Sequence, residues 1–173
     1  MAWKLEDNSL KVKAELNDIT IAWLHKWGNE VASQAKRNCQ MTDDHGQLRK
    51  SYRAMFDDGD GVAEIGSPLE SAYWEEFGTG SHADTGSNGG REGRKGWWVY
   101  TPGNDGPDGY TSNYYATKEE AESMAAYIRK RYKKEAVVTN GRDPSYTLQK
   151  AFEAVKNPAE ADLERKLRGG MND

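Results

Sequence analysis

One short run of the chain constrains its folding more than any other: Tyr73-Trp74-Glu75-Glu76-Phe77-Gly78-Thr79-Gly80. Its three aromatic rings need an apolar surface to cover them, because one large ring can bury roughly 150 to 250 Å². Gly78 and Gly80 leave the backbone free to turn where a side chain would collide. The run therefore predicts a point where a core ends and a loop begins. We interpret its two glutamates as polar positions on a short packed segment, not as an acid-base pair.

The composition is compatible with a compact but polar protein. Of the 173 residues only 36% are hydrophobic and 30% are charged, which leaves few aliphatic residues for a core. The six tryptophans and nine tyrosines compensate, because aromatic rings bury large areas. We expect one domain with appendages, in which some aromatic residues are buried only by partners.

Charge and cysteine content exclude several classes of protein. A net charge of -4 argues against a protein whose main task is to grip nucleic acid, which needs a basic surface. The single cysteine, Cys39, excludes an intramolecular disulfide framework and suits a reducing compartment. We find no apolar run of about 18 residues and no signal-peptide core at the N-terminus. We therefore expect a soluble protein that is made in the host cytoplasm and does not enter a membrane.

The first half of the chain predicts a helix followed by a hairpin. Apolar residues recur at helical spacing over residues 18–39, with Asn17 or Asp18 as the N-cap. Alternating residues predict strands at 48–56 and 62–66, joined by a turn at 57–61. Residues 1–16 are expected to form a lead-in, either extended or a short strand, and residues 69–77 a helical turn or two.

The second half predicts two more strands and three more helices. The aromatic residues of 96–101 favour a strand between two long polar loops, at 81–95 and 102–112. Thr117 and Glu120 form a capping box that predicts a helix, followed by a short edge strand at 136–139. Asp143 and Pro144 predict the start of another helix, and Asn157-Pro158 the start of a separate terminal helix.

Together these elements predict an α+β fold. We expect a small antiparallel sheet of the strands near 48–56, 62–66 and 96–101, packed against the N-terminal and C-terminal helices, with long glycine-rich loops. Residues 17–156 would form a single domain that includes the loop 81–95 and a helical insertion at 112–135. Residues 1–16 would be a lead-in, and residues 157–173 a terminal helix and tail.

Four groups of residues could carry chemistry, and for each we favour a structural interpretation. Cys39 could be a nucleophile beside His25, His45 or His82, but their spacing is not diagnostic. The aspartates of the 57–61 turn could bind a cation, yet the glutamate that completes a calcium loop is absent. The glycine-rich basic run 89–96 lacks the ending of a phosphate-binding loop. Trp97, Trp98 and Tyr100 could form a ligand platform, but alternation makes both strand faces apolar and favours a core or a protein interface.

The order of the motifs resembles one family of tailed-phage proteins. The chain runs from Asp44-His45-Gly46-Gln47-Leu48-Arg49-Lys50-Ser51 through the run that ends in Glu76-Phe77-Gly78-Thr79-Gly80. Gly96-Trp97-Trp98-Val99-Tyr100, Gly141-Arg142-Asp143-Pro144 and Ala151-Phe152-Glu153 follow. This order is similar, over about residues 17–156, to the gene-product-ten-like neck, tail-completion or minor tail proteins of long-tailed phages with the HK-ninety-seven type of head. His45 stands where the family usually has threonine, and Tyr73-Trp74 where it often has Tyr-Ala.

The resemblance implies a structural virion protein and not an enzyme. It implies no catalytic residues, cofactor or metal. Such proteins assemble as homo-oligomeric rings around the DNA channel at the head-tail junction or tail end, beside head-closure, tail-terminator or tail-tube proteins. DNA would pass through without tight binding, which the acidic balance of the chain would favour.

We expect the subunit interface to lie around the loop 81–95, which would reach a neighbouring subunit. The predicted interface residues are Phe77, Gly78, Thr79, Gly80, Arg91, Arg94, Lys95, Trp97, Trp98 and Tyr100. An alternative is a nucleic-acid-binding module that uses the basic loop and the basic cluster at 129–134. A hydrolase is a third possibility, for which Cys39 would have to lie close to a histidine.

Overall fold

A computed structural model describes residues 9–40, 46–86, 95–101 and 114–170. The residues group into two compact units: unit 1 comprises 1–39, 48–68 and 147–173, and unit 2 comprises 40–47 and 69–146. The single domain expected over residues 17–156 stays a prediction, because grouping by proximity does not show whether the units fold separately. No helix in the described ranges combines the length and the apolar character that crossing a membrane requires.

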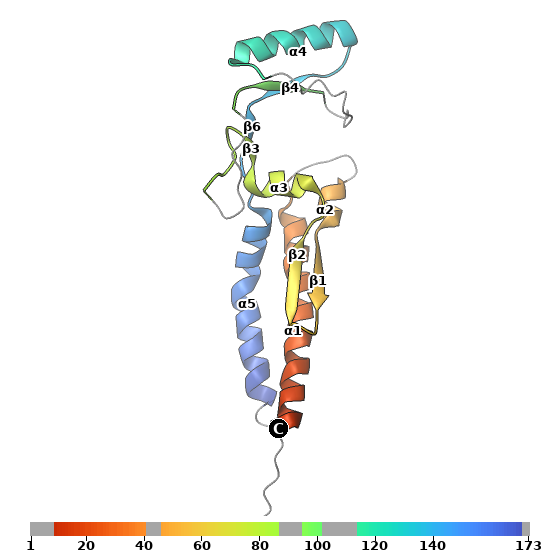
Figure 1. Cartoon of the computed structure of the whole chain (residues 1–173), viewed down its shortest axis with the longest axis vertical. Coiled ribbons are helices and arrows are strands. Elements are labelled where there is room, and N and C mark those ends of the chain that lie inside the picture. The colour runs from red at the N-terminus through yellow and green to blue at the C-terminus, as the bar shows by residue number, and fades with distance from the viewer. Residues whose placement is uncertain (1–8, 41–45, 87–94, 102–113, 171–173) are drawn as a thin grey trace, which may run out of the picture. The chain divides into compact units, whose positions relative to one another are not determined.

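Unit 1 is built on two long helices, α1 (Ser9–Asn38) and α5 (Thr147–Gly170), which run side by side (Figure 1). Asn38 near the end of α1 donates to the carbonyl of Thr147 at the start of α5, so the helices are antiparallel. The buried apolar residues on both helices are small: Val31, Ala32 and Ala35 on α1, and Ala151, Val155 and Ala159 on α5. Such a stripe at helical spacing lets two helices approach closely.

Polar contacts join the same two helices away from this stripe. The indole of Trp23 donates to the Ala159 carbonyl at 2.8 Å. Lys26 Nζ and Trp27 Nε1 each lie 2.9 Å from Oδ2 of Asp162, which is largely buried. These two donors hold the pKa of the Asp162 carboxyl below its usual value, because they stabilise its charged form. Asp162 is therefore a charged cross-link between α1 and α5 and not a free acidic group.

The hairpin of β1 (Arg53–Asp57) and β2 (Val62–Gly66) lies along α1 in the same unit (Figure 1). Its turn is closed by Asp57, whose Oδ1 accepts the backbone N–H groups of Gly59 and Asp60. Gly28 of α1 has a direct reason to lack a side chain, since a Cβ there would lie 2.8 Å from the ring of Phe56. The cost of a glycine inside a helix is thus offset by the close approach of the hairpin.

Unit 2 contains α3 (Glu70–Phe77), β3 (Thr79–Gly80), β4 (Trp98–Tyr100), α4 (Lys118–Tyr132), β5 (Val137–Thr139) and β6 (Gly141–Arg142). β4 pairs antiparallel with β5, and α4 covers this pair. The core between them consists of Val99, Ala121, Ala125, Ile128 and Ala136, with partly buried Trp97, Tyr115, Met124 and Val138 packed against it. The predicted capping box is present, because Thr117 and Glu120 each accept from the backbone of the other. Among the described strands, β3 pairs with β6 alone.

The mixed α+β class and the N-terminal and C-terminal helices are confirmed, but the predicted three-stranded sheet is wrong. The described strands form three separate two-stranded pairs, β1–β2, β3–β6 and β4–β5. The aromatic strand pairs with Val137–Thr139 and not with the hairpin. Alternation along a strand predicts that it has a buried face, but it does not identify the partner strand.

Three predicted element boundaries are also wrong. α1 begins at Ser9, so the described part of the lead-in is helical, and Asn17 and Asp18 lie inside the helix. Residues 47–51 form a short helix, α2 (Gln47–Ser51), and the strand begins only at Arg53. α5 begins at Thr147 rather than at Asp143-Pro144, and it continues through Pro158 to Gly170. Long-range contacts to α1 outweigh the local stop signal of a proline.

Candidate structural site at the end of α3 and the β3–β6 ladder

The aromatic and acidic run forms α3, and its last turn is fully bonded. The last four carbonyls of a helix have no partner within the helix. Here Trp74 O accepts from Gly78 N, and Phe77 O accepts from Asp84 N. The carbonyls of Glu75 and Glu76 accept from the backbone N–H groups of Ser145 and Tyr146. The end of this helix is thus completed by a segment that lies about 70 residues further along the chain.

The glycines that follow α3 allow two backbone segments to meet. Gly80 lies opposite Gly141 in the β3–β6 ladder, and Thr79 lies opposite Arg142. A Cβ on Gly80 would collide with the Asn140 carbonyl, and a Cβ on Gly141 would collide with the Thr79 carbonyl. Gly78 has φ 73° and would place a Cβ 2.8 Å from Pro144 N. The Phe-Gly-Thr-Gly and Gly-Arg-Asp-Pro motifs are therefore the two sides of one contact.

A buried ion pair lies beside this ladder. The side chain of Glu75 is 0% exposed, and its Oε2 lies 2.9 Å from an Arg142 guanidinium nitrogen. Its other oxygen accepts the backbone N–H of Gln40 at 2.7 Å. A buried carboxylate requires such partners, because removal from water is costly unless charge and hydrogen bonds compensate. Glu75 is a structural anchor in this position.

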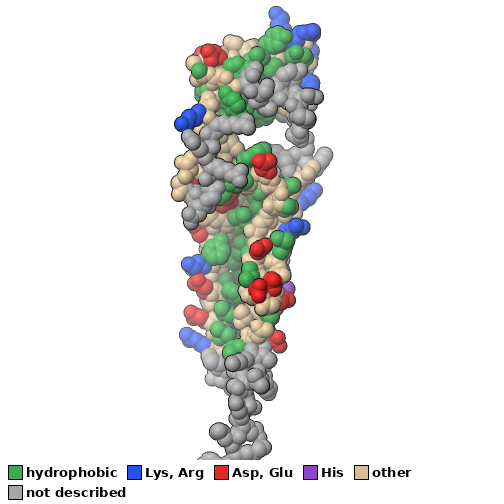
Figure 2. Space-filling model, viewed as in Figure 1, with side chains coloured by type: hydrophobic (Ala, Val, Ile, Leu, Met, Phe, Trp, Pro, Cys, Tyr) green, Lys and Arg blue, Asp and Glu red, His purple; other side chains and the backbone are tan. Residues whose placement is uncertain are grey.

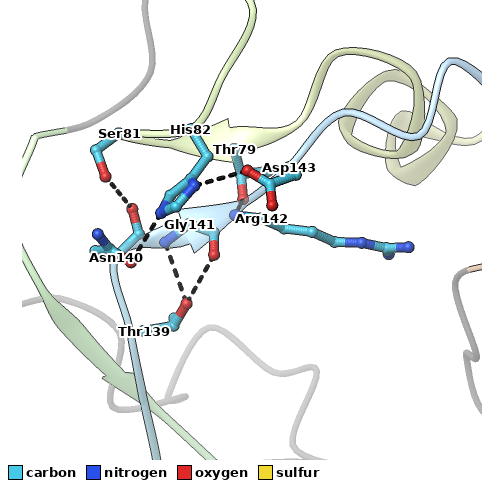
Figure 3. A network of polar contacts seen from close by, with 8 residues as sticks. All are labelled: Thr79, Ser81, His82, Thr139, Asn140, Gly141, Arg142 and Asp143. Carbon is cyan, nitrogen blue, oxygen red and sulfur yellow. Dashed lines mark hydrogen bonds and ion pairs between the residues drawn. The ribbon is translucent and has the colours of Figure 1, made fainter.

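His82 forms the outer edge of the site (Figure 3). Its Nδ1 lies 2.8 Å from Asp143 Oδ1, and its Nε2 lies 3.1 Å from Asn140 Oδ1. Both neighbours accept hydrogen bonds, so the doubly protonated imidazolium, which donates from both nitrogens, fits best. The hydrogen bonds to Asp143 and to Asn140 raise the pKa of His82 above its usual value.

The arrangement of the side chains around His82 differs from that of a catalytic triad (Figure 3). Ser81, His82 and Asp143 are the residue types of a hydrolytic triad, in which the serine hydroxyl bonds the histidine nitrogen opposite the aspartate. Here that nitrogen faces the Asn140 side chain, and Ser81 Oγ donates to the Asn140 carbonyl at 3.0 Å (Figure 3). Ser81 and His82 thus hold Asn140 in place, and Asp143 holds His82.

The structure also places the other groups considered as chemical sites. Cys39 is buried at the end of α1, and His25 lies about 20 Å away along that helix at 1.5 Å per residue. His25 instead bonds Asp58 and stacks on Phe56. His45 and most of the basic run 89–96 lie outside the described residues. In the part of the chain that is described, no three His, Cys, Asp or Glu residues are grouped to hold a metal.

The predicted interface residues occupy different environments. Phe77, Gly78, Thr79 and Gly80 lie in the site itself, where their backbone contacts are internal to unit 2. Trp97 forms a bridge to Tyr115, and Trp98 and Tyr100 lie on β4. Tyr100 is 38% exposed in the single chain, and its predicted role in a subunit interface stays a prediction. Lys95 is exposed, and Arg91 and Arg94 lie outside the described residues.

The start of the predicted loop 81–95 is held more firmly than its composition indicates. The backbone N–H groups of Ser81, His82, Ala83 and Asp84 all donate to carbonyls of unit 2. Asp84 also accepts from the hydroxyl of Tyr146 and from Gly86 N, both at 2.8 Å. Within the described residues, the segment up to Gly86 is part of the site. Residues 87–94 lie outside them.

Sequence reasoning missed the partners of the run: Arg142, Asp143, Asn140, Ser145 and Tyr146. A signal was available, because Gly141-Arg142-Asp143-Pro144 had been singled out as a motif. As the start of a helix, this motif accounts for Pro144 but leaves Gly141 without a reason. Two glycine motifs that are far apart in sequence can indicate that their backbones pass close together.

Comparison with known proteins gives one match, to a family model. Residues 4–78 match a family model named HK97-gp10_like, with the description "Bacteriophage HK97-gp10, putative tail-component". The resemblance predicted from the motifs is thereby confirmed, and a structural role in a phage particle is supported. The match covers α1, the hairpin and α3, and it ends at Gly78, inside the candidate site. No curated protein and no solved structure matches the chain.

Proposed function

We propose that this chain, whose residues 4–78 match the HK97-gp10_like family model, is a structural protein of the neck or tail-completion ring of a tailed phage. In this role several copies would surround the DNA channel and join the head to the tail. Its neighbours would be a head-closure, tail-terminator or tail-tube protein. The observation that carries the proposal is the family match, because no other single feature of the chain points to a particle.

The candidate site supports a role in assembly rather than in chemistry. Its charged groups bond one another: Glu75 binds Arg142, and His82 binds Asp143. A site that satisfies its own polar groups is suited to hold a backbone in one conformation. The site holds the base of the loop 81–95, where residues 81–86 follow β3.

The mechanism that we propose is exchange of this loop between subunits. The loop would reach a neighbouring subunit, and Phe77, Trp97 and Trp98 would anchor its base. Both ends of the loop are tied to ladders of unit 2, since β3 pairs with β6 and Trp97 bridges to Tyr115. Fixed ends lower the entropy that a contacting segment loses when it binds.

Deletion of residues 87–94 tests this mechanism. The deletion leaves every described contact of the site in place, so we expect a folded protein that no longer forms the ring. Native mass spectrometry of the purified chain would give the mass of the assembled particle, and circular dichroism would report folding. The matched control is deletion of residues 103–110, which removes an equally long segment of the second loop.

A ring that forms normally after deletion of 87–94 would exclude the loop as the contact, while the location in the particle would remain to be tested. That location is tested separately by labelling the chain in virions. Labels at the neck or tail end agree with the proposal. Their absence from assembled particles would overturn it.

A further inference from the structure

Helix α4 has one covered face and one face in solvent. Ala121, Ala125 and Ile128 are buried against the β4–β5 pair. Away from this contact Tyr127 is 53% exposed, and Tyr132 in the last turn of α4 is 42% exposed, although both are large side chains. α4 lies beyond the part of the chain that matches the family, so the family match assigns no role to this face.

The C-terminal end of α4 and the two residues after it are strongly basic. Figure 2 shows Lys and Arg side chains gathered over one end of α4. Arg129 is engaged there, because it donates to the Ala136 carbonyl and lies 3.9 Å from Glu122. The other four cations are exposed, and within the described residues no carboxylate lies within 4.0 Å of their charged groups. They are Lys130, Arg131, Lys133 and Lys134.

This number of cations exceeds what the helix needs. One or two positive side chains in the last turn suffice to offset the helix dipole. Lys133 also occupies the C-cap in the left-handed region, with φ 54°, where glycine is the favoured residue. In a chain with a net charge of -4, four uncompensated cations next to one another form a local positive surface.

We propose that the basic C-terminal end of α4 and the residues that follow it, comprising Tyr127, Lys130, Arg131, Tyr132, Lys133 and Lys134, bind the phosphate backbone of duplex DNA. Lysine and arginine neutralise phosphates without reading the sequence, and tyrosine hydroxyls can donate to phosphate oxygens. The proposal concerns the surface of unit 2 alone. It does not depend on whether the protein forms a ring.

The geometry favours DNA over a protein partner, and duplex over single-stranded DNA. Protein interfaces are depleted in lysine, whereas three of the four free cations here are lysines. Single strands are bound chiefly by stacking of bases on open aromatic faces. Here Tyr127 and Tyr132 are in edge contact, with ring centres 6.2 Å apart, and Arg131 lies over the Tyr132 ring at 5.8 Å. Because of these contacts, the two tyrosines can reach DNA more readily with their hydroxyl groups than with their ring faces.

The test uses the full chain and a fluorescent duplex of about 30 base pairs at about 50 mM salt, where phosphate contacts are strong. We expect binding that weakens steeply as salt rises. The triple variant Lys130→Gln, Arg131→Gln, Lys134→Gln should bind at least about tenfold more weakly. The slope of log affinity against log salt should also fall by about 0.9 for each lost phosphate contact.

The matched control is Arg53→Gln, Lys156→Gln, Arg165→Gln, which removes the same charge from exposed positions of unit 1. It should bind DNA within about twofold of the unmodified chain, because only non-specific charge is lost. Three outcomes would overturn the proposal: no binding of duplex at low salt, an equal loss in the control variant, or tighter binding of a single strand of the same length. Thermal unfolding of both variants confirms that each is folded.

Discussion

Arg142 shows how one residue can join distant parts of this chain. Its guanidinium pairs with the buried Glu75, and its backbone N–H donates to the hydroxyl of Thr79. It also lies opposite Thr79 in the ladder. Removing either charged partner would leave the other partly or fully removed from water, which is costly. At the scale of single residues, the charges of Arg142 and Glu75 therefore stabilise the fold of this site.

His82 leads to a prediction about pH. Its pKa is raised by Asp143 and Asn140, so the folded state binds the proton more tightly than the unfolded chain does. The stabilisation is thus fully present below about pH 6.5, the value for an unfolded histidine, and is lost as pH rises through the folded-state pKa. Because the side chain is 38% exposed, we expect the free energy of unfolding to change by no more than about 1 kcal/mol.

The pKa itself is measurable by NMR from the ring protons of His82. The variant Asp143→Asn removes the main cause, so its His82 should titrate closer to the ordinary value. The control is Asp58→Asn, which changes an aspartate in unit 1 and should leave the titration of His82 as it is. An unmodified protein in which His82 titrates at or below pH 6.5 would contradict the contacts described here.

At the scale of elements, local signals identified most of the regular structure. The hairpin strand Val62–Gly66, α3, the strand within 96–101 and the capped helix α4 were all predicted from spacing and end residues. The failures occurred where distant contacts decide the outcome. Pro158 indicates a helix start by itself, but bonds from Trp23 and Trp27 to the far side of this proline hold α5 as one helix.

The β3–β6 ladder is the element most sensitive to a small substitution. In Gly141→Ala the new methyl group would meet the Thr79 carbonyl, and φ 134° is unfavourable for alanine. We expect a loss of about 2–4 kcal/mol in the free energy of unfolding, measured with urea.

Gly66→Ala is the matched control, since nothing lies within 4 Å of a Cβ there and its φ is not positive. It should change stability by less than about 1 kcal/mol. If Gly141→Ala proved as mild as Gly66→Ala, the close backbone approach in the ladder would not exist.

At the scale of the whole molecule, unit 1 is assembled from three separate stretches of chain, and unit 2 is inserted between them. The chain passes between the units at residues 39–40, 47–48, 68–69 and 146–147. Neither unit can therefore be cut out as one continuous piece. The family match also covers parts of both units, since residues 4–78 include α1, the hairpin and α3.

We expect the chain to unfold as a single domain. Circular dichroism, which follows mostly helix, and tryptophan fluorescence should then give coincident urea transitions. Gly141→Ala, although it lies in unit 2, should shift both signals equally. Two separate transitions, with only one shifted by the substitution, would show that the units fold independently.

The sequence by itself determined most of the segments that form helices and strands, the turn of the hairpin, the cap of α4 and the resemblance to a family. These properties depend on neighbours within a few residues, where spacing and end groups act directly. Only the tertiary structure decided that Gly80 meets Gly141, that Glu75 binds Arg142 and that β4 pairs with β5. Each of these contacts joins residues dozens of positions apart. Many residues of the chain have the types that such contacts require, and the tertiary structure determines which of them come close together.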